Sequence, residues 1–69
     1  MPVDDTTNGP AQYEEASVLG LAPGVWPRII ERNGTTYRHV RDERHTASGE
    51  LVCVHYRSDA GALLHVFND

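Results

Sequence analysis

The sequence predicts a small α+β domain, in which one short N-terminal helix packs on a four-stranded antiparallel meander. Three observations lead to this fold class. Three turn signals divide residues 26–69 into four segments with strand-like composition. The loops between these segments hold only two or three residues, which suits antiparallel neighbours. Residues 10–19 instead space their apolar side chains as a helix does.

A strongly bent, SH3-like small β-barrel is the alternative fold. In that arrangement residues 17–21 pair as a fifth strand instead of ending a helix. The two folds share their hairpins and differ only in the role of the N-terminal segment. Such hairpins occur in many small domains, so the fold class by itself identifies no function.

The chain is predicted to begin with a leader and to continue as one folded unit. Residues 1–9 are polar and acidic and have no apolar anchor, so we expect them to be disordered. Residues 10–69 then form a single small α+β domain. Residues 1–24 carry four acids and no base, whereas residues 25–69 carry six of each.

The predicted helix covers residues 10–19. It opens with a proline, which is favoured at the first helical position, and Gly20 follows as a stop signal. Tyr13, Ala16 and Leu19 fall on one stripe of such a helix. A helix this short is marginal alone, so we expect its stripe to dock on the sheet.

The turn chemistry predicts where the strands begin and end. Asn33-Gly34 is a strong two-residue hairpin signal, because both residue types tolerate a positive φ. Residues 47–49 and 59–61 are three-residue loops that each end in glycine. The predicted strands cover residues 26–32, 35–45, 51–57 and 62–67.

Loop lengths also predict the register, and the register predicts which side chains form the core. The expected cross-strand pairs are Ile30–Tyr37, Val40–Tyr56, Asp42–Val54, Val54–Val66, Tyr56–Leu64 and His55–His65. Side chains alternate between the two faces of a strand. The predicted core face therefore consists of Ile29, Val40, Val52, Val54, Tyr56, Leu64 and Val66. A slip of one residue would move a whole strand's set to the other face.

The opposite face is mixed in character, and we expect it to carry the function. Its predicted members are Trp26, Ile30, Tyr37, His39, Arg41, Leu51, Cys53, His55, Leu63, His65 and Phe67. A solvated face would hold fewer large apolar residues, and a buried face would not hold an arginine and three histidines.

Histidine and cysteine side chains on that face raise the question of a metal or catalytic site. His55 opposite His65, with Cys53 one step along, would bring three candidate zinc ligands together. However, the sequence has no familiar metal-ligand spacing, and Cys53 lies in mid-strand without a feature that would activate its thiol. We therefore expect no metal, no cofactor and no catalytic residue.

Length and composition exclude several classes of protein. A chain of 69 residues with a net charge of −4 is too short for a multidomain enzyme or a solenoid. No apolar run approaches the ~20 residues of a membrane span, and the start does not resemble a signal peptide. The single cysteine, Cys53, cannot form an intramolecular disulfide, which favours a cytoplasmic setting.

These observations predict a non-enzymatic protein-binding module of the accessory or regulatory kind, a type common in bacteriophages and mobile elements. The predicted partner-binding residues are Trp26, Tyr37, His39, Arg41, His55, Leu63, His65 and Phe67. The alternative is a nucleic-acid-binding module that uses the arginine and aromatic side chains of the same face. The net negative charge disfavours that alternative.

The last predicted strand suggests how a protein partner binds. Residues 62–67 include no proline and no formal charge, and in a meander they form an unprotected edge. We therefore expect this edge to pair with a strand of the partner or with a second copy, which would make a homodimer.

Overall fold

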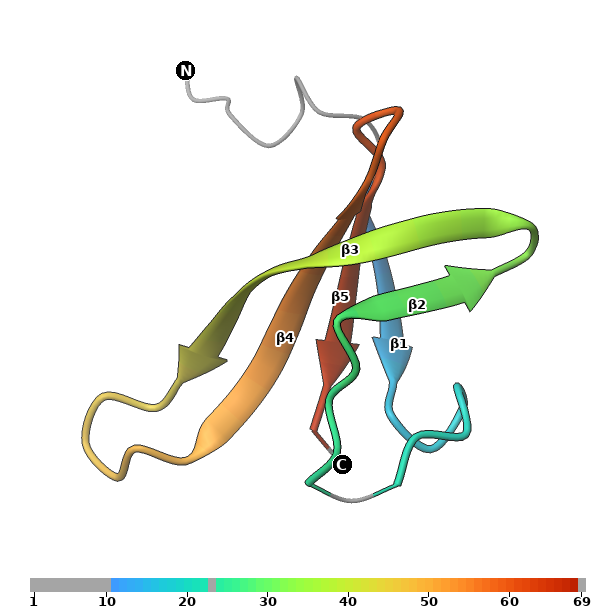
Figure 1. Ribbon diagram of the computed structural model, residues 1–69. Helices are drawn as coiled ribbons and strands as arrows, with labels where there is room; N and C mark the ends of the chain where they lie inside the picture. The colour runs from blue at the N-terminus through green and yellow to red at the C-terminus, as the bar shows by residue number, and fades with distance from the viewer. Residues whose placement is uncertain (1–10, 23, 69) are drawn as a thin grey trace.

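The computed structural model of the chain describes residues 11–22 and 24–68. In these ranges the protein is all-β, with five strands in one curled sheet of mixed strand direction, a half-barrel (Figure 1). The strands are β1 (Ala11–Glu15), β2 (Ile29–Arg32), β3 (Thr35–Arg44), β4 (Leu51–Ser58) and β5 (Leu63–Phe67). Their order across the sheet is β1-β5-β4-β3-β2. The predicted leader, residues 1–9, lies outside the described residues. The described residues include no helix that is long and apolar enough to cross a bilayer.

The predicted N-terminal helix is wrong, and so is the α+β fold class that depends on it. Ala11–Glu15 forms β1, which runs parallel to β5 and pairs Gln12 with Leu64 and Glu14 with Val66. An isolated helix of this length is marginal. Pairing with β5 instead satisfies the backbone groups that a four-stranded meander would leave open at its edge. The physical reason for the error is thus a long-range contact that local spacing cannot reveal.

The apolar stripe that predicted the helix is divided between a strand and a turn. Tyr13 lies on β1 and is 59% exposed, whereas Ala16 is buried at the start of the turn. The backbone N–H groups of Leu19 and Leu21 donate to the Ala16 carbonyl at 3.1 and 3.0 Å. Gly20 follows with a φ of 75°, so it stops a turn, not a helix.

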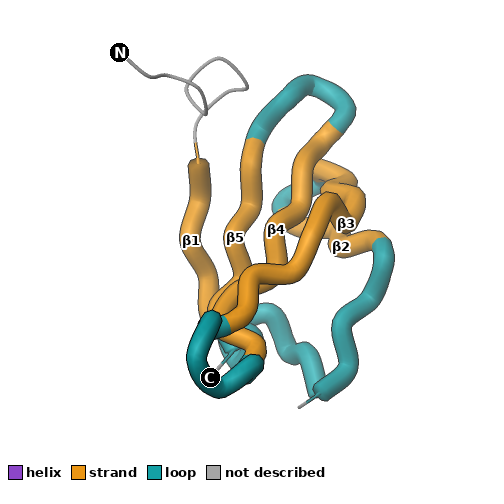
Figure 2. Tube along the Cα trace, turned by 90° about the vertical axis from the view of Figure 1, so that its left-hand side faces the viewer, coloured by secondary structure: helices purple, strands orange, loops and turns teal. Residues whose placement is uncertain are grey.

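The curl of the sheet is compatible with the alternative, SH3-like fold. Figures 1 and 2 show the β2–β3 hairpin folding at a steep angle over one side of β1, β5 and β4. The fifth strand is Ala11–Glu15, however, and not residues 17–21. The curl brings the two outer strands close to each other, as the ion pair between Arg32 of β2 and Glu14 of β1 shows.

The strand that was expected to be a free edge lies in the interior of the sheet. β5 pairs with β4 on one side and with β1 on the other. A partner strand or a second copy therefore finds no open edge at residues 62–67, which corrects the predicted docking place. Among the described residues, the outer strands are β1 and β2.

The predicted hairpins are present, and the first has the expected turn. Asn33 and Gly34 have φ values of 54° and 78°, and they join β2 to β3 with Ile30 opposite Tyr37. Positive φ at both central residues is the mark of a type I′ turn. At the other end of the sheet, β4 and β5 pair in the predicted register, with His55 opposite His65.

A β-bulge in β3 alters the register that the loops predict. Asp42 lies opposite Val54 as expected, but His39 takes the place of Val40 opposite Tyr56. Val40 is the extra residue between the paired His39 and Arg41. Because side chains alternate, one extra residue moves everything before it to the other face.

The bulge explains which predicted core residues are correct. Four of them, on β4 and β5, are fully buried: Val54, Tyr56, Leu64 and Val66. Ile29 and Val40 are 50% and 53% exposed, so their assignment to the core is wrong. Ile30 and Tyr37, which had been placed on the mixed face, are buried instead. Val52 is also half exposed, at 37%, beside a second register shift between Glu43 and Arg44.

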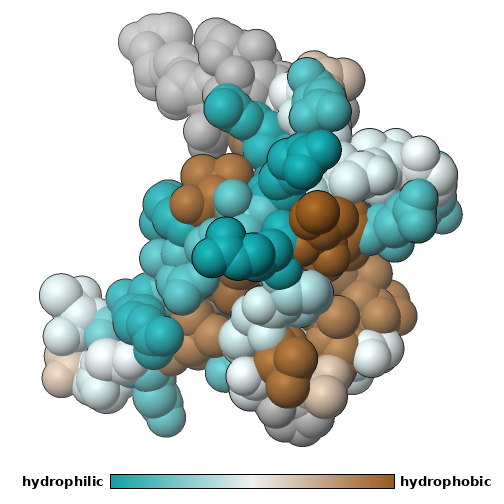
Figure 3. Space-filling view, in the orientation of Figure 1, coloured by the Kyte–Doolittle hydropathy of each residue, from teal (hydrophilic) through white to brown (hydrophobic). Residues whose placement is uncertain are grey.

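The loop between β1 and β2 covers the open side of the core. Leu19, Leu21 and Trp26 pack against the buried cluster. The hydroxyl of Tyr56 donates a hydrogen bond of 2.7 Å to the Pro27 carbonyl, which ties this loop to the central strand. In Figure 3 the larger apolar area lies at the lower right, where the loop runs in Figure 1.

Gly34→Val tests the turn between β2 and β3. Valine at a φ of 78° is strongly disfavoured, so we expect the free energy of unfolding to fall by about 1–3 kcal/mol. Urea denaturation measures this loss. Thr36→Val introduces the same side chain at an exposed strand position and should change stability by less than ~0.5 kcal/mol. Equal stability of the two variants would contradict a type I′ turn.

Tyr56 should make the fold sensitive to alkaline pH. Burial, aided by the charge of Asp42, raises the pKa of Tyr56 from 10.0 to about 12. The folded state therefore favours the protonated phenol, and its contribution to stability is complete below pH 10 and disappears as the pH rises to about 12. Urea denaturation at a series of pH values should show this decline. Tyr56→Phe should reduce the decline, and the exposed-site control Tyr13→Phe should retain it.

Candidate functional site

A shallow pocket lies on the face of the sheet opposite the core, which we call the outer face. Its volume is about 230 Å³, and it lies where the bulge of β3 meets β4 and β5. The residues that line it are Val40, Arg41, His55, Tyr56, Arg57, Leu63 and His65. The outer face also carries Tyr13 of β1, Cys53 of β4 and Phe67 of β5, which the strand register places on the same side.

Cross-strand pairing positions the pocket residues. His55 of β4 lies opposite His65 of β5, and Arg57 lies opposite Leu63. On the other side of β4, Arg41 lies opposite His55, in the same register as the predicted Asp42–Val54 pair, because the bulge changes only the residues before it. The bulge contributes its extra residue, Val40, to the lining of the pocket.

The two imidazoles form the centre of a chain of ring contacts. The ring centroids of His55 and His65 are 4.4 Å apart. His65 meets the edge of Tyr13 at 5.0 Å, and Tyr13 stacks with Phe67 at 6.0 Å. The outer face is thus aromatic over β1 and β5. The sequence did not predict a place for Tyr13 here, because it assigned that residue to a helix.

His55 also contacts an acid on its other side. It donates a hydrogen bond of 2.8 Å from Nε2 to the Glu43 carboxylate. This hydrogen bond is the main cause that holds the pKa of Glu43 below its ordinary value of 4.5, and the charges of His55, Arg41 and His65 act in the same direction. Glu43 therefore stays ionised beside the pocket and orients the His55 ring.

Over β3 and β4 the outer face is basic. Arg38 and Arg57 lie directly opposite each other, and Arg41 is close by on β3. Arg38 reaches Asp59 at 3.5 Å, but neither Arg41 nor Arg57 forms an ion pair with any described residue. Two guanidinium groups thus border the pocket without an ion pair to the described residues, although the charge of Arg41 also acts on Glu43.

Five of the eight predicted partner-binding residues meet on the outer face. They are Arg41, His55, Leu63, His65 and Phe67. The other three lie elsewhere, which corrects the predicted surface. Trp26 packs against the core from the loop, and Tyr37 is buried. His39 lies on the core side, because the bulge pairs it with Tyr56.

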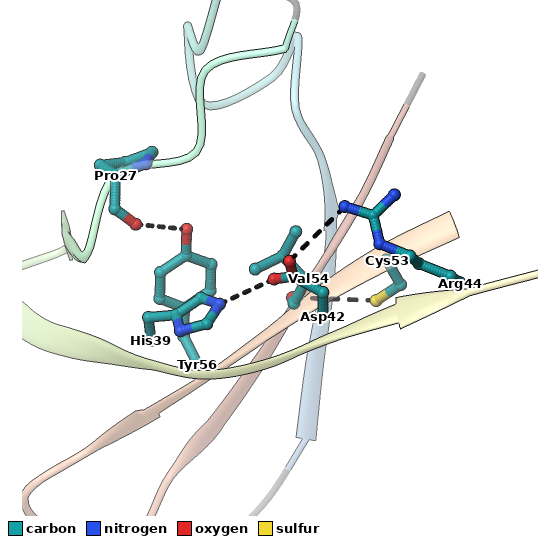
Figure 4. A network of polar contacts seen from close by, with 7 residues as sticks. All are labelled: Pro27, His39, Asp42, Arg44, Cys53, Val54 and Tyr56. Atoms are coloured by element: carbon teal, nitrogen blue, oxygen red, sulfur yellow. Dashed lines mark hydrogen bonds and ion pairs between the residues drawn. The ribbon is translucent and has the colours of Figure 1, made fainter. Parts of the chain in front are cut away.

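Figure 4 shows what His39 does instead. Its ring meets the edge of the Tyr56 ring at a centroid distance of 5.7 Å, and its Nε2 bonds to Asp42 at 2.7 Å. Arg44 approaches the same carboxylate at 3.9 Å. These contacts hold the His39 ring against the buried Tyr56, so His39 has a structural role.

The thiol of Cys53 is poorly suited to nucleophilic chemistry on this face. Cys53 is 2% exposed, and burial, together with the charge of Glu43, raises the pKa of its thiol above the ordinary value. A protonated, buried thiol is a weak nucleophile.

Comparisons with protein-family models, with curated proteins and with solved structures give no match for this chain.

The facing arginines generate a prediction about stability. Like charges directly opposite each other on a sheet are destabilising, so Arg57→Glu should raise the free energy of unfolding by about 0.2–1 kcal/mol. Urea denaturation at low salt measures the change. Arg28→Glu alters the net charge equally at an exposed position before β2 and should give no such gain. A gain of the same size in both variants would assign the effect to net charge instead of to the Arg38–Arg57 pair.

Proposed function

We propose that this protein is a non-enzymatic protein-binding module that docks an acidic segment of its partner on the outer face. The observation that carries the proposal is the pair of pocket arginines, Arg41 and Arg57, which form no ion pair with the described residues. Arg38 lies opposite Arg57, so the protein accepts adjacent like charges at this point. A negatively charged partner would offset that repulsion.

The chemistry of the pocket suggests how such a partner would bind. Guanidinium groups bind carboxylates through paired hydrogen bonds, which give both affinity and orientation. Leu63 and the stacked Tyr13 and Phe67 supply apolar surface beside the charges. The expected ligand is therefore a peptide segment with one or two acidic side chains followed by an apolar or aromatic one. At about 230 Å³ the pocket suits a side chain and not a whole small-molecule substrate.

Three features support a non-enzymatic role. The pocket is shallow, and Cys53, the only cysteine in the chain, has a buried thiol with a raised pKa. The His55 imidazole is hydrogen-bonded to the Glu43 carboxylate. A cytoplasmic setting belongs to the same proposal, because a reducing compartment keeps a lone thiol unmodified.

Self-association remains a proposal, but its predicted location changes. Because β5 is paired on both sides, a second copy would have to add to β1 or β2 or pack on the outer face. A homodimer is therefore no longer tied to residues 62–67.

Nucleic-acid binding is the second candidate, and one observation favours it. Arg38, Arg41 and Arg57 make a short basic stripe beside aromatic side chains, as in proteins that bind single strands. The net charge of −4 weighs against a phosphate backbone as ligand. Affinity for an oligonucleotide should fall steeply with salt.

A displayed library of random peptides tests the proposed function. Peptides enriched on the protein should be acidic, and their affinity should fall at least ~10-fold in Arg41→Gln and in Arg57→Gln, because a hydrogen bond to a charged group contributes about 1.5–3 kcal/mol. Arg28→Gln is the matched control, since Arg28 lies outside the pocket. Fluorescence anisotropy measures each affinity.

Two outcomes of the peptide experiment would contradict the proposal. Enrichment of peptides without acidic residues would show that the arginines do not select the ligand. An equal loss of affinity in the Arg28→Gln control would show that the effect comes from net charge and not from the pocket. Tight binding of a labelled single-stranded oligonucleotide by the wild type, with no acidic peptide enriched, would favour the second candidate.

A further inference from the structure

We propose that Glu43, Cys53 and His55 form a binding site for one zinc ion on the outer face. Each residue offers one ligand atom, and the three atoms lie within 4.8 Å of one another. The sequence alone led us to expect no metal, because it suggested only histidine and cysteine at uncertain positions. The structure adds the carboxylate of Glu43, which comes from the neighbouring strand β3.

The fold holds the three residues at fixed places on adjacent strands. Glu43 of β3 lies directly opposite Cys53 of β4. Cys53 and His55 are two residues apart on β4, so their side chains point to the same face. The register shifts in β3, on either side of Arg41–Glu43, determine this alignment. Ligands on paired strands lose little freedom when they bind, which favours a preformed site.

The kinds of ligand atom favour zinc over magnesium or calcium. Zinc accepts thiolate, imidazole and carboxylate together, at about 2.0–2.3 Å from each donor atom, so two of its ligands lie roughly 3.5 Å apart. Magnesium and calcium prefer all-oxygen sites. Closing the present separation requires side-chain movements of about 1 Å. The Glu43 side chain is half exposed and can make much of that movement.

Zinc would replace a hydrogen bond and a proton. His55 now donates to Glu43 at 2.8 Å, and in the metal complex both groups would turn their acceptor atoms to the ion. The thiol of Cys53 would bind as the thiolate and release its proton to solvent. No atom changes its oxidation state, and the binding needs no reactant other than the zinc ion.

The surroundings suit an ion with three protein ligands. The ring of His65 is 4.4 Å from that of His55, so a second imidazole lies beside one of the three ligands. A chain of 69 residues without a disulfide also gains from a metal that crosslinks two strands, because small domains commonly need such support. Zinc binding should therefore raise the melting temperature.

Zinc and cobalt titrations of the untagged, metal-free full chain test the proposal. We expect saturation at one ion per chain and a rise of several degrees in melting temperature with excess zinc. Cobalt should give a sulfur-to-metal charge-transfer absorption that reports Cys53 as a ligand. Glu43→Gln, Cys53→Ser and His55→Gln should each weaken zinc at least 10-fold. His45→Gln and Glu50→Gln, exposed residues outside the cluster, are the matched controls.

Glu43→Gln is the deciding variant, because an exposed carboxylate can be replaced without disturbing the core. Unchanged zinc affinity in Glu43→Gln, or a cobalt complex without sulfur-to-metal absorption, would overturn the site. The same holds if the wild type shows no saturable binding. His55 is shared with the arginine pocket, but Glu43 and Cys53 do not line it. Acidic-peptide binding can therefore be measured separately in Glu43→Gln, and its failure would not count against the metal.

Discussion

The extra residue at Val40 is the constraint on which both faces of the sheet depend. It inverts the side chains that precede it, so Tyr37 and Ile30 enter the core while Val40 itself stays exposed. After the bulge, β3 presents Arg41 and Glu43 to the outer face. The pocket lies at the same irregularity on which the core positions of Ile30 and Tyr37 depend. Bulges that re-aim side chains are common next to functional sites.

The parts of the fold that depend on adjacent segments were predictable. Asn33-Gly34 determines its turn locally, and the loop at residues 59–61 determines the β4–β5 register, so the buried centre of the sheet followed from the sequence. β1 was not predictable, because Tyr13 and Ala16 fit a helical stripe and a parallel strand equally well. Only contact with β5, about fifty residues later, decides between them.

The candidate site was predictable to the extent that it lies on β4 and β5. His55, Leu63, His65 and Phe67 were placed together correctly because their register follows from one short loop. His39 and Trp26 were misplaced, since the first lies before the bulge and the second belongs to a covering loop. The pairing of Glu43 with Cys53 was already implied by the predicted Asp42–Val54 pair. The carboxylate was overlooked as a ligand because the expected cluster consisted of histidine and cysteine only.

The parallel pairing of β1 with β5 also has a consequence for the order of folding. Ala11–Glu15 is made first, yet its partner, Leu63–Phe67, is made near the end of the described chain. Contacts between such distant segments form late, because closing a long loop costs more entropy. At a synthesis rate of about 5–20 residues per second, β1 waits several seconds on the ribosome before β5 emerges. During that interval the β2–β3 and β3–β4 hairpins can assemble, but the edge of the sheet that β1 covers does not yet exist.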